Sequence, residues 1–125
     1  MPKASMGSAT EIVEVPGYEG RLQKLEGGYT VAFERYSEDN DLSPFFDGLP
    51  NNQCQSAHWG YVFRGKVGFK FGDHEELFEE GDAYYAPPGH TPVFYAGAEV
   101  VEFSPTEDLE RTIEVVTKNM ETADS

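Results

Sequence analysis

The stretch HWGYVFRG, residues 58–65, and the stretch GDAYYAPPGHTP, residues 81–92, decide the fold. Each contains aromatic residues and ends in glycine or proline, which is typical of short strands that end in tight turns. Only 15 residues separate the two stretches. The segments KVGFKFGD and HEELFEEGD fill this interval and predict two further strands.

Similar segments lie on both sides of this centre. Upstream they are EIVEV, GRLQKLEGG and YTVAFERY, and downstream they are TPVFYAG and AEVVEFSP. Many short strands at intervals of about 8–12 residues predict an all-β sandwich or barrel. The segment SEDNDLSPFFDGLPNN interrupts them and is rich in turn-forming residues, so it predicts a loop with one helical turn near residues 44–46.

The end of the chain changes to helical periodicity. The segment SPTEDLERTIEVVTKNME predicts a helix over residues 105–120, with Ser104 as the N-cap, Pro105 at the first helical position and Glu107 completing a capping box. Its apolar residues share one face, which predicts packing against the strands; they are Leu109, Ile113, Val116 and Met120. We therefore expect a domain over residues 11–121, a disordered tail over 1–10 and a second tail over 122–125.

Composition narrows the possible partners. The 125 residues carry 23 acidic and 9 basic side chains, a net charge of −14, which disfavours binding to nucleic acid and to anionic membrane surfaces. A single cysteine excludes an intrachain disulfide and fits a reducing compartment. The sequence has neither a secretory signal nor an apolar run of the ~20 residues that a membrane span needs. We therefore expect a cytoplasmic protein.

The two central stretches resemble the two conserved motifs of the cupin superfamily. The stretch YVFRG ends in a glycine turn at Gly65 and resembles the first motif, and Gly81-Asp82 followed by the Pro-x-Gly of residues 87–89 resembles the second. The resemblance extends over about residues 28 to 105. It implies a double-stranded β-helix, the cupin barrel, to which the sequence adds one C-terminal α-helix.

The resemblance also locates the slots in which many cupins hold a metal. Counted from Gly65, the first-motif slots fall on Asn52, Cys54 and His58, and the second-motif histidine slot falls on Pro92. None of these positions holds the standard ligand type, which argues against ordinary cupin iron chemistry.

The residues themselves nevertheless suggest a different ligand set. In an extended segment, residues of equal parity share a face, so Asn52, Cys54 and His58 point the same way. His90, two residues before the second-motif slot, has the parity to enter the same barrel mouth. Cys54, His58 and His90 together would suit one divalent transition metal, namely Zn, Fe or Cu, with a fourth coordination position left open.

The same residues also allow a structural interpretation. A lone cysteine is often a small buried hydrophobic side chain, and either histidine could be a hydrogen-bonded core or rim residue. His74, in the turn GDHEEL, is expected to be solvated. From the sequence alone, both interpretations of the cluster stay open.

Three further features concern ligands and partners. Trp59, Tyr61 and Phe63 form an aromatic stripe on the opposite face of their strand, which suggests core packing or a homodimer interface. Tyr84 and Tyr85 point to opposite faces, and we assign Tyr85 to the pocket. Glu102 lies mid-strand between apolar neighbours, where it must face water, a cation or the pocket, and of these we favour an outward orientation toward water.

Three functions are compatible with these sequence features. The favoured one is binding of a small molecule in the barrel mouth by His58, His90, Cys54, Asn52, Tyr85 and Glu102, with or without a metal. The second is a metal-dependent enzyme of the dioxygenase, isomerase or lyase type, as the resemblance implies. The third is a non-catalytic dimeric scaffold. The fold does not choose between them, because this barrel serves unrelated chemistries.

Overall fold

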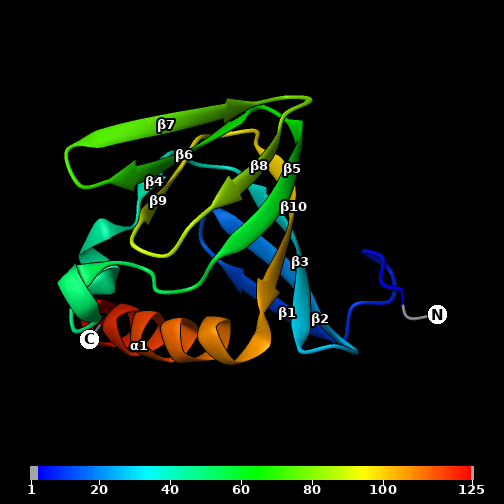
Figure 1. Cartoon of the computed structure of the whole chain (residues 1–125), viewed down its shortest axis with the longest axis horizontal. Helices are drawn as coiled ribbons and strands as arrows, with labels where there is room; N and C mark the ends of the chain where they lie inside the picture. The colour runs from blue at the N-terminus through cyan, green and yellow to red at the C-terminus, as the bar shows by residue number, and fades with distance from the viewer. Residues whose placement is uncertain (1–2, 125) are drawn as a thin grey trace.

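Two antiparallel sheets face one another, and one long helix packs beside them in the computed structural model, which describes residues 3–124 (Figure 1). The larger sheet has the order β1-β2-β3-β10-β5-β8, and the smaller one has the order β4-β9-β6-β7. The strands are β1 (Glu11–Val15), β2 (Tyr18–Leu25), β3 (Tyr29–Tyr36), β4 (Asn40–Asp41), β5 (His58–Arg64), β6 (Lys66–Phe71), β7 (His74–Glu79), β8 (Ala83–Ala86), β9 (Thr91–Phe94) and β10 (Glu99–Pro105). The helices are η1 (Ser43–Phe46), η2 (Pro50–Asn52) and α1 (Thr106–Asp124), of which η1 and η2 are short 3-10 helices.

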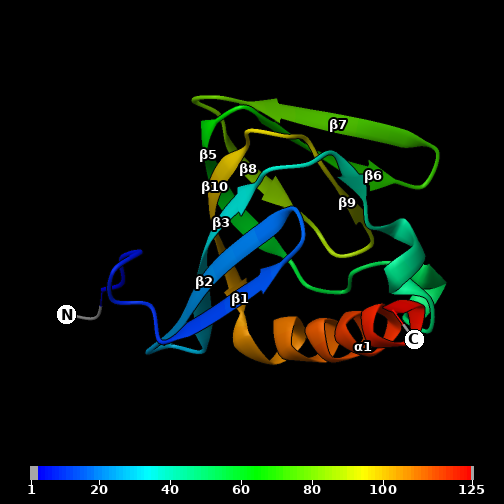
Figure 2. The same ribbon diagram turned by 180° about the vertical axis from the view of Figure 1, so that it is seen from behind.

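The predicted all-β class with one C-terminal helix is confirmed. Each of the nine predicted segments contains a strand, and η1 supplies the helical turn expected near residues 44–46. The short strand β4 is an addition, because it lies in the segment that the turn-forming residues predicted as a loop. Figure 2 shows the same arrangement from behind, with the β1–β2 hairpin beside the barrel and α1 along one end.

Alternating residues divide the large sheet into an inner and an outer face. On β5, His58 and Val62 are buried, whereas Trp59, Tyr61 and Phe63 are exposed. The buried core cluster lies between the two sheets and comprises Tyr36, Val62, Val67, Phe69, Tyr84, Ala86, Ala98 and Val100. The two-residue period of the sequence therefore determines which side chains reach the barrel interior.

The outer face of the large sheet carries exposed aromatic side chains, which we call the aromatic face. Trp59 packs on Tyr85 at a ring separation of 5.1 Å, and Tyr61 lies edge-to-face with Phe63 at 5.4 Å. Its members are Tyr29, Trp59, Tyr61, Phe63, Tyr85 and Phe103, each at least 41% exposed. The predicted stripe is thus not part of the barrel core.

The helix begins one residue later and ends later than predicted. It spans Thr106–Asp124, so all but the last residue of the expected tail 122–125 belongs to it, and Ser125 lies outside the described residues. Pro105 is the last residue of β10. Ser104 is also in that strand and does not cap the helix, because its hydroxyl pairs with His58 inside the barrel.

The N-terminal segment 3–10 contains no strand or helix, but it contacts β2. The Gln23 side chain donates to the carbonyl oxygen of Lys3, and the Ser8 hydroxyl donates to Gln23. Met1 and Pro2, which belong to the same predicted tail, lie outside the described residues. Within residues 3–124, no helix combines the length and apolar character needed to span a membrane.

Helix α1 covers one end of the barrel. Its residues Val116 and Met120 pack on a second buried cluster, formed by Leu42, Phe46 and Cys54. The Asn119 side chain donates to two backbone carbonyl oxygens of the η1 region, those of Phe45 and Asp47, at 2.7 and 2.8 Å. The helix therefore packs directly over the segment that carries Cys54.

Candidate functional site

Cys54, His58 and His90 come together inside this covered end of the barrel. One ligand atom from each residue, the cysteine sulfur or a histidine ring nitrogen, lies within 4.8 Å of the others. The backbone holds two of them in place, because the Cys54 N–H donates to the His90 carbonyl and the Gly89 N–H donates to the Cys54 carbonyl, both at 2.7 Å. Residues 36 positions apart are thereby joined by a short antiparallel bridge.

The hydrogen bonds at Nδ1 orient both imidazole rings. His90 Nδ1 lies 2.6 Å from the Pro87 carbonyl oxygen, so this nitrogen carries the proton and Nε2 presents a lone pair. His90 Nε2 is buried and has no hydrogen-bond partner within the described residues. His58 Nδ1 lies 2.6 Å from the Ser104 hydroxyl, and its Nε2 lies 3.5 Å from the Cys54 sulfur.

Burial controls the charge of all three side chains. It lowers the pKa of His58 to about 4, and burial together with the neighbouring His58 lowers the pKa of His90 to about 4. Burial also raises the pKa of the Cys54 thiol to about 11. At neutral pH the metal-free cluster therefore has two neutral imidazoles and a thiol, which must lose its proton to bind a metal.

The donor set fits a transition metal. Two imidazole nitrogens and one thiolate sulfur are ligands that zinc accepts in a tetrahedral site, and iron and copper also accept them. Hydrogen bonds at the second nitrogen of each ring are the usual way in which proteins orient metal-binding histidines. His74, the remaining histidine, is solvated as predicted, with a side chain 59% exposed.

The cluster is more enclosed than an open barrel mouth. Cys54, His58 and His90 are 3%, 7% and 1% exposed, respectively. The hydroxyl oxygen of Thr112, from α1, lies 3.9 Å from the Cys54 sulfur. The sequence predicted a pocket at this position, but the helix packs over it because its apolar face covers the cluster that contains Cys54.

Two of the predicted ligand-binding residues lie elsewhere. Asn52 is exposed in η2, where its side-chain oxygen accepts a hydrogen bond from the Gly48 N–H. It leaves the predicted face because β5 begins only at His58, and the chain before it turns with Asn52 in a left-handed conformation. Tyr85 is 50% exposed on the aromatic face, and Tyr84, of opposite parity, is the tyrosine that points inward.

Glu102 points into the barrel and not outward as expected, because it shares the inner-face parity of Gly60 and accepts a hydrogen bond from the inward Tyr84. There it meets a residue that the sequence pattern did not single out. This residue is Glu34 on β3, which is close enough to share a hydrogen bond with Glu102. The Tyr18 hydroxyl donates to Glu34 at 2.6 Å, and the Tyr84 hydroxyl donates to Glu102. The sequence signal for this carboxyl pair was the alternation in YTVAFERY, which gives Glu34 the parity of buried Ala32 and Tyr36.

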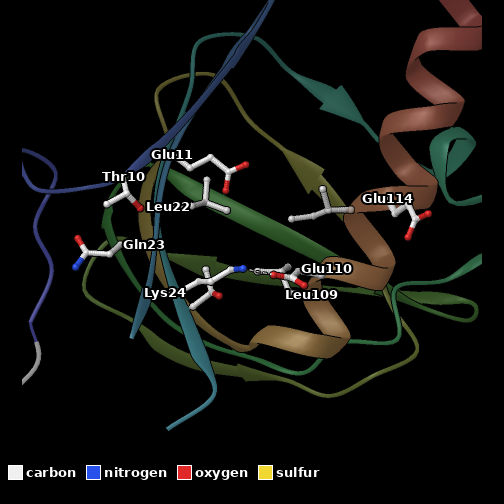
Figure 3. A pocket seen from close by; sticks show the side chains of 10 residues that line it. Thr10, Glu11, Leu22, Gln23, Lys24, Leu109, Glu110 and Glu114 are labelled. Carbon is white, nitrogen blue, oxygen red and sulfur yellow. Dashed lines mark ion pairs between the residues drawn. The ribbon is translucent and has the colours of Figure 1, made fainter. Parts of the chain in front are cut away.

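Two surface hollows lie apart from the Cys54 cluster. One, of about 640 Å³, lies between β2 and α1 and includes Leu22, Lys24 and Ile113 in its lining. Figure 3 shows Lys24 directed across it toward Glu110, with which it forms an ion pair of 2.7 Å. The other hollow lies at the Tyr36 end of β3. Neither hollow is lined by Cys54, His58 or His90.

Comparison with known proteins identifies the architecture. No protein-family model and no curated protein sequence matches this chain. A protein of unknown function from Rhizobium leguminosarum bv. viciae has a TM-score of 0.60 and 14% identity, over 83% of this chain and 94% of the other. Pac13, described as a nucleoside dehydratase, has a TM-score of 0.59 and 14% identity, over 85% of this chain and 82% of its own.

A third similarity is to a deletion mutant of the oxalate decarboxylase of Bacillus subtilis. Its TM-score is 0.61 and its identity is 17%, over 82% of this chain but only 28% of the decarboxylase. The fold of the present chain is therefore that of the cupin barrel, as the two sequence motifs predicted. At these identities the similarity identifies the fold alone.

Proposed function

We propose that this protein is a small cupin-fold protein that binds one divalent transition metal through Cys54, His58 and His90, and a small molecule at the fourth coordination position. The observation that carries the proposal is the orphaned Nε2 atom of His90. A fully buried nitrogen without a partner costs about 1–3 kcal/mol, and a metal held jointly with His58 and Cys54 would remove that cost.

The burial of the cluster limits the fourth ligand to a small one. All three donor residues are less than 10% exposed, and α1 lies over the cysteine. A water molecule or a compact anion fits such a closed coordination sphere, whereas a large substrate would require α1 to move. The closed site therefore makes a metal-dependent enzyme of the dioxygenase, isomerase or lyase type the second candidate function. A bound metal would supply Lewis acidity to any ligand that reached it.

Two observations bear on the rest of the proposal. Pac13, whose fold is similar, has been crystallised as a Streptomyces variant with uridine, so a barrel of this kind holds a small molecule in that protein. For the present chain we propose a cytoplasmic location, a small-molecule ligand, no nucleic acid or membrane partner, and a homodimer. The dimer is also compatible with the scaffold alternative, which the exposed aromatic face favours.

The test is to purify the protein without a histidine tag and to measure its metal content by elemental analysis. We expect about one zinc, iron or copper ion per chain, and loss of that metal in His58→Ala and His90→Ala. The matched control is His74→Ala, because His74 is exposed and does not belong to the cluster.

Cobalt substitution adds a spectroscopic measurement that identifies the sulfur ligand. A thiolate bound to Co²⁺ gives a charge-transfer band in the near ultraviolet, and we expect Cys54→Ser to remove it. If the native protein contains no metal and takes up none from Zn²⁺, Fe²⁺ or Cu²⁺ solutions, the metal proposal is wrong and the cluster is a buried hydrogen-bonded group.

A further inference from the structure

Glu34 and Glu102 form a carboxyl pair in the interior of the barrel, apart from the cysteine–histidine cluster. In the register of β3 with β10, Glu34 lies opposite Val100 and Glu102 lies opposite Ala32. The two carboxyl groups are therefore diagonal neighbours on the inner face of adjacent strands. Both residues are partly buried, and they are close enough to share a hydrogen bond.

A tyrosine supports each member of the pair from a different strand. The Tyr18 hydroxyl on β2 donates to Glu34, and the Tyr84 hydroxyl on β8 donates to Glu102. Glycines make both approaches possible. A Cβ atom at Gly20 would lie 2.2 Å from the Tyr18 hydroxyl oxygen, and a Cβ atom at Gly60 would lie 2.4 Å from the Tyr84 ring.

The hydrogen-bonding capacity of this group requires a proton. Two carboxylates are both acceptors, so they cannot hydrogen-bond to one another unless one of them is protonated. The tyrosine hydroxyls already donate to the pair and do not neutralise it. The titratable groups that interact with Glu34 are Glu102 and three tyrosines, Tyr18, Tyr36 and Tyr84. Glu102 interacts with Glu34, with the same three tyrosines and with the Cys54 thiol, and no basic side chain is among these groups.

We propose that Glu34 and Glu102 share one proton in the folded protein and form a pH-sensitive lock that joins β3 to β10 and, through Tyr18 and Tyr84, holds β2 and β8 to them. With the proton in place, one carboxylic acid donates to the other carboxylate across the strand pair. Without it, two negative charges lie side by side in a poorly solvated interior, and the four strands lose a common contact.

The environment favours retention of this proton near neutral pH. Burial, and then the charge of Glu102, raise the pKa of Glu34 to about 8, and burial raises the pKa of Glu102 as well. Because the groups are coupled, the apparent values belong to the pair. The unfolded chain releases both protons near pH 4.5, the ordinary value, so from there to about pH 8 the folded state binds one more proton.

The sign of the effect on stability follows from this difference. The contribution of the shared proton is complete below about pH 4.5 and is lost progressively as the pH rises to about 8. Across this window the unfolding equilibrium constant should rise up to tenfold per pH unit because of this proton alone. The buried histidines titrate in part of the same range, so the effect must be measured as a difference between variants.

The experiment compares denaturant unfolding of the wild type, Glu34→Gln and Glu102→Gln at half-unit steps from pH 5 to pH 9. The side-chain amide of a glutamine can donate a hydrogen bond to the remaining carboxylate at every pH. The shared proton of the wild type can do so only at the lower pH values. At pH 5 we therefore expect each variant to be as stable as the wild type or less stable. At pH 8.5 we expect the folding equilibrium constant of each variant to be at least tenfold larger than that of the wild type. Glu26→Gln, at an exposed glutamate, is the control and should follow the wild type at every pH.

A second measurement keeps the proposal testable if a variant does not fold. In the wild-type protein labelled with ¹³C at glutamate side chains, one carboxyl resonance should titrate with an apparent midpoint above pH 7, well separated from the other glutamates. If every glutamate titrates below pH 6, or if the stability curves of the wild type and of the foldable variants run parallel from pH 5 to pH 9, the shared proton does not exist.

Discussion

The Ser104 hydroxyl orients the imidazole ring of His58 within the candidate metal site. It lies 2.6 Å from His58 Nδ1 and is 2% exposed, so no water competes for this contact. With Nδ1 directed at Ser104, Nε2 is directed at the cysteine sulfur. Ser104 is thus a positioning residue, which would act on a metal only through His58.

Ser104→Ala should weaken zinc or cobalt binding by about 10–100-fold, the range found when a partner of a metal-binding histidine is removed. The measurement is a competitive titration against a chromophoric chelator. Ser104→Thr keeps a hydroxyl and should restore most of the affinity, which a loss of packing alone would not explain. Ser37→Ala, on an exposed loop, should bind as the wild type does. Equal affinity in Ser104→Ala would show that the ring needs no such support.

Gly60 is required by its neighbour across the strand pair and not by its own backbone conformation. The Tyr84 ring lies over it on the way to Glu102, and an added methyl group would approach the ring to 2.4 Å. Gly60→Ala should therefore displace Tyr84 and destabilise the protein by about 1–3 kcal/mol. Denaturant unfolding measures this free energy.

The matched control for this substitution is Gly7→Ala. A Cβ atom at Gly7 meets nothing within 4 Å, so the stability should stay the same or increase slightly through the unfolded state. If both alanine variants behave alike, the close approach of the Tyr84 ring has no energetic importance.

Parity along a strand explains which site residues could be predicted. His58 lies on a regular strand, so its inward direction followed from the alternation, and Cys54 and His90 reached the same interior as the motif spacing suggested. Asn52 fails the same rule because its segment is not extended. Glu34 was missed because a carboxylate beside an arginine in ERY resembles an exposed strand residue, and only the facing Tyr18 and Glu102 reveal its partners.

At the level of elements, helix α1 closes the end of the barrel that holds Cys54. Sequence periodicity predicted that one face of this helix packs on the strands, and part of that face, Val116 and Met120, does contact the cluster around Leu42 and Phe46. The docking position could not be predicted, because it depends on Asn119, whose amide donates to two carbonyls 72 and 74 residues away. A polar residue of this kind carries no signal in the periodicity.

Asn119→Ala should loosen α1 and expose Cys54. The loss of two hydrogen bonds should cost about 1–2 kcal/mol. If opening of the helix controls access to the thiol, the metal-free variant should react with a thiol reagent about tenfold faster than the wild type under native conditions.

The control for helix opening is Glu121→Ala, which removes an exposed side chain two residues further along the same helix. Its thiol should react at the wild-type rate. An unchanged rate in Asn119→Ala would mean that the reagent reaches Cys54 by another path, and that the contact of α1 with η1 does not gate the site.

At the scale of the whole molecule, charge is distributed unevenly. The chain has a net charge of −14, yet the aromatic face consists of neutral side chains, with Phe103 opposite Trp59 and Val101 opposite Tyr61 across β10 and β5. At its margin, Arg35 and Arg64 both pair with Glu99, a locally basic group. Two copies of so acidic a protein would repel one another over much of their surface, but the aromatic face carries no negative charge to cause such repulsion.

This distribution makes a second copy the occupant that the aromatic face suits best. Large exposed apolar patches on soluble proteins commonly mark interaction sites, and aromatic side chains are enriched at protein interfaces. Burial of this face in a symmetric dimer would remove aromatic surface from water without burying a carboxylate. We therefore predict that the wild type sediments as a dimer at micromolar concentration.

Tyr61→Glu should convert this dimer to a folded monomer, because the carboxylate would meet its own copy or an aromatic neighbour in a dry interface. Leu77→Glu is the matched control: Leu77 is an apolar residue of similar exposure, 47% against 41%, but it lies on β7 in the other sheet. Sedimentation velocity separates the outcomes. If Leu77→Glu disrupts the dimer and Tyr61→Glu does not, the interface lies on the smaller sheet. If the wild type is a monomer at about 100 μM, the aromatic face is not a dimer interface, and it no longer supports the scaffold alternative.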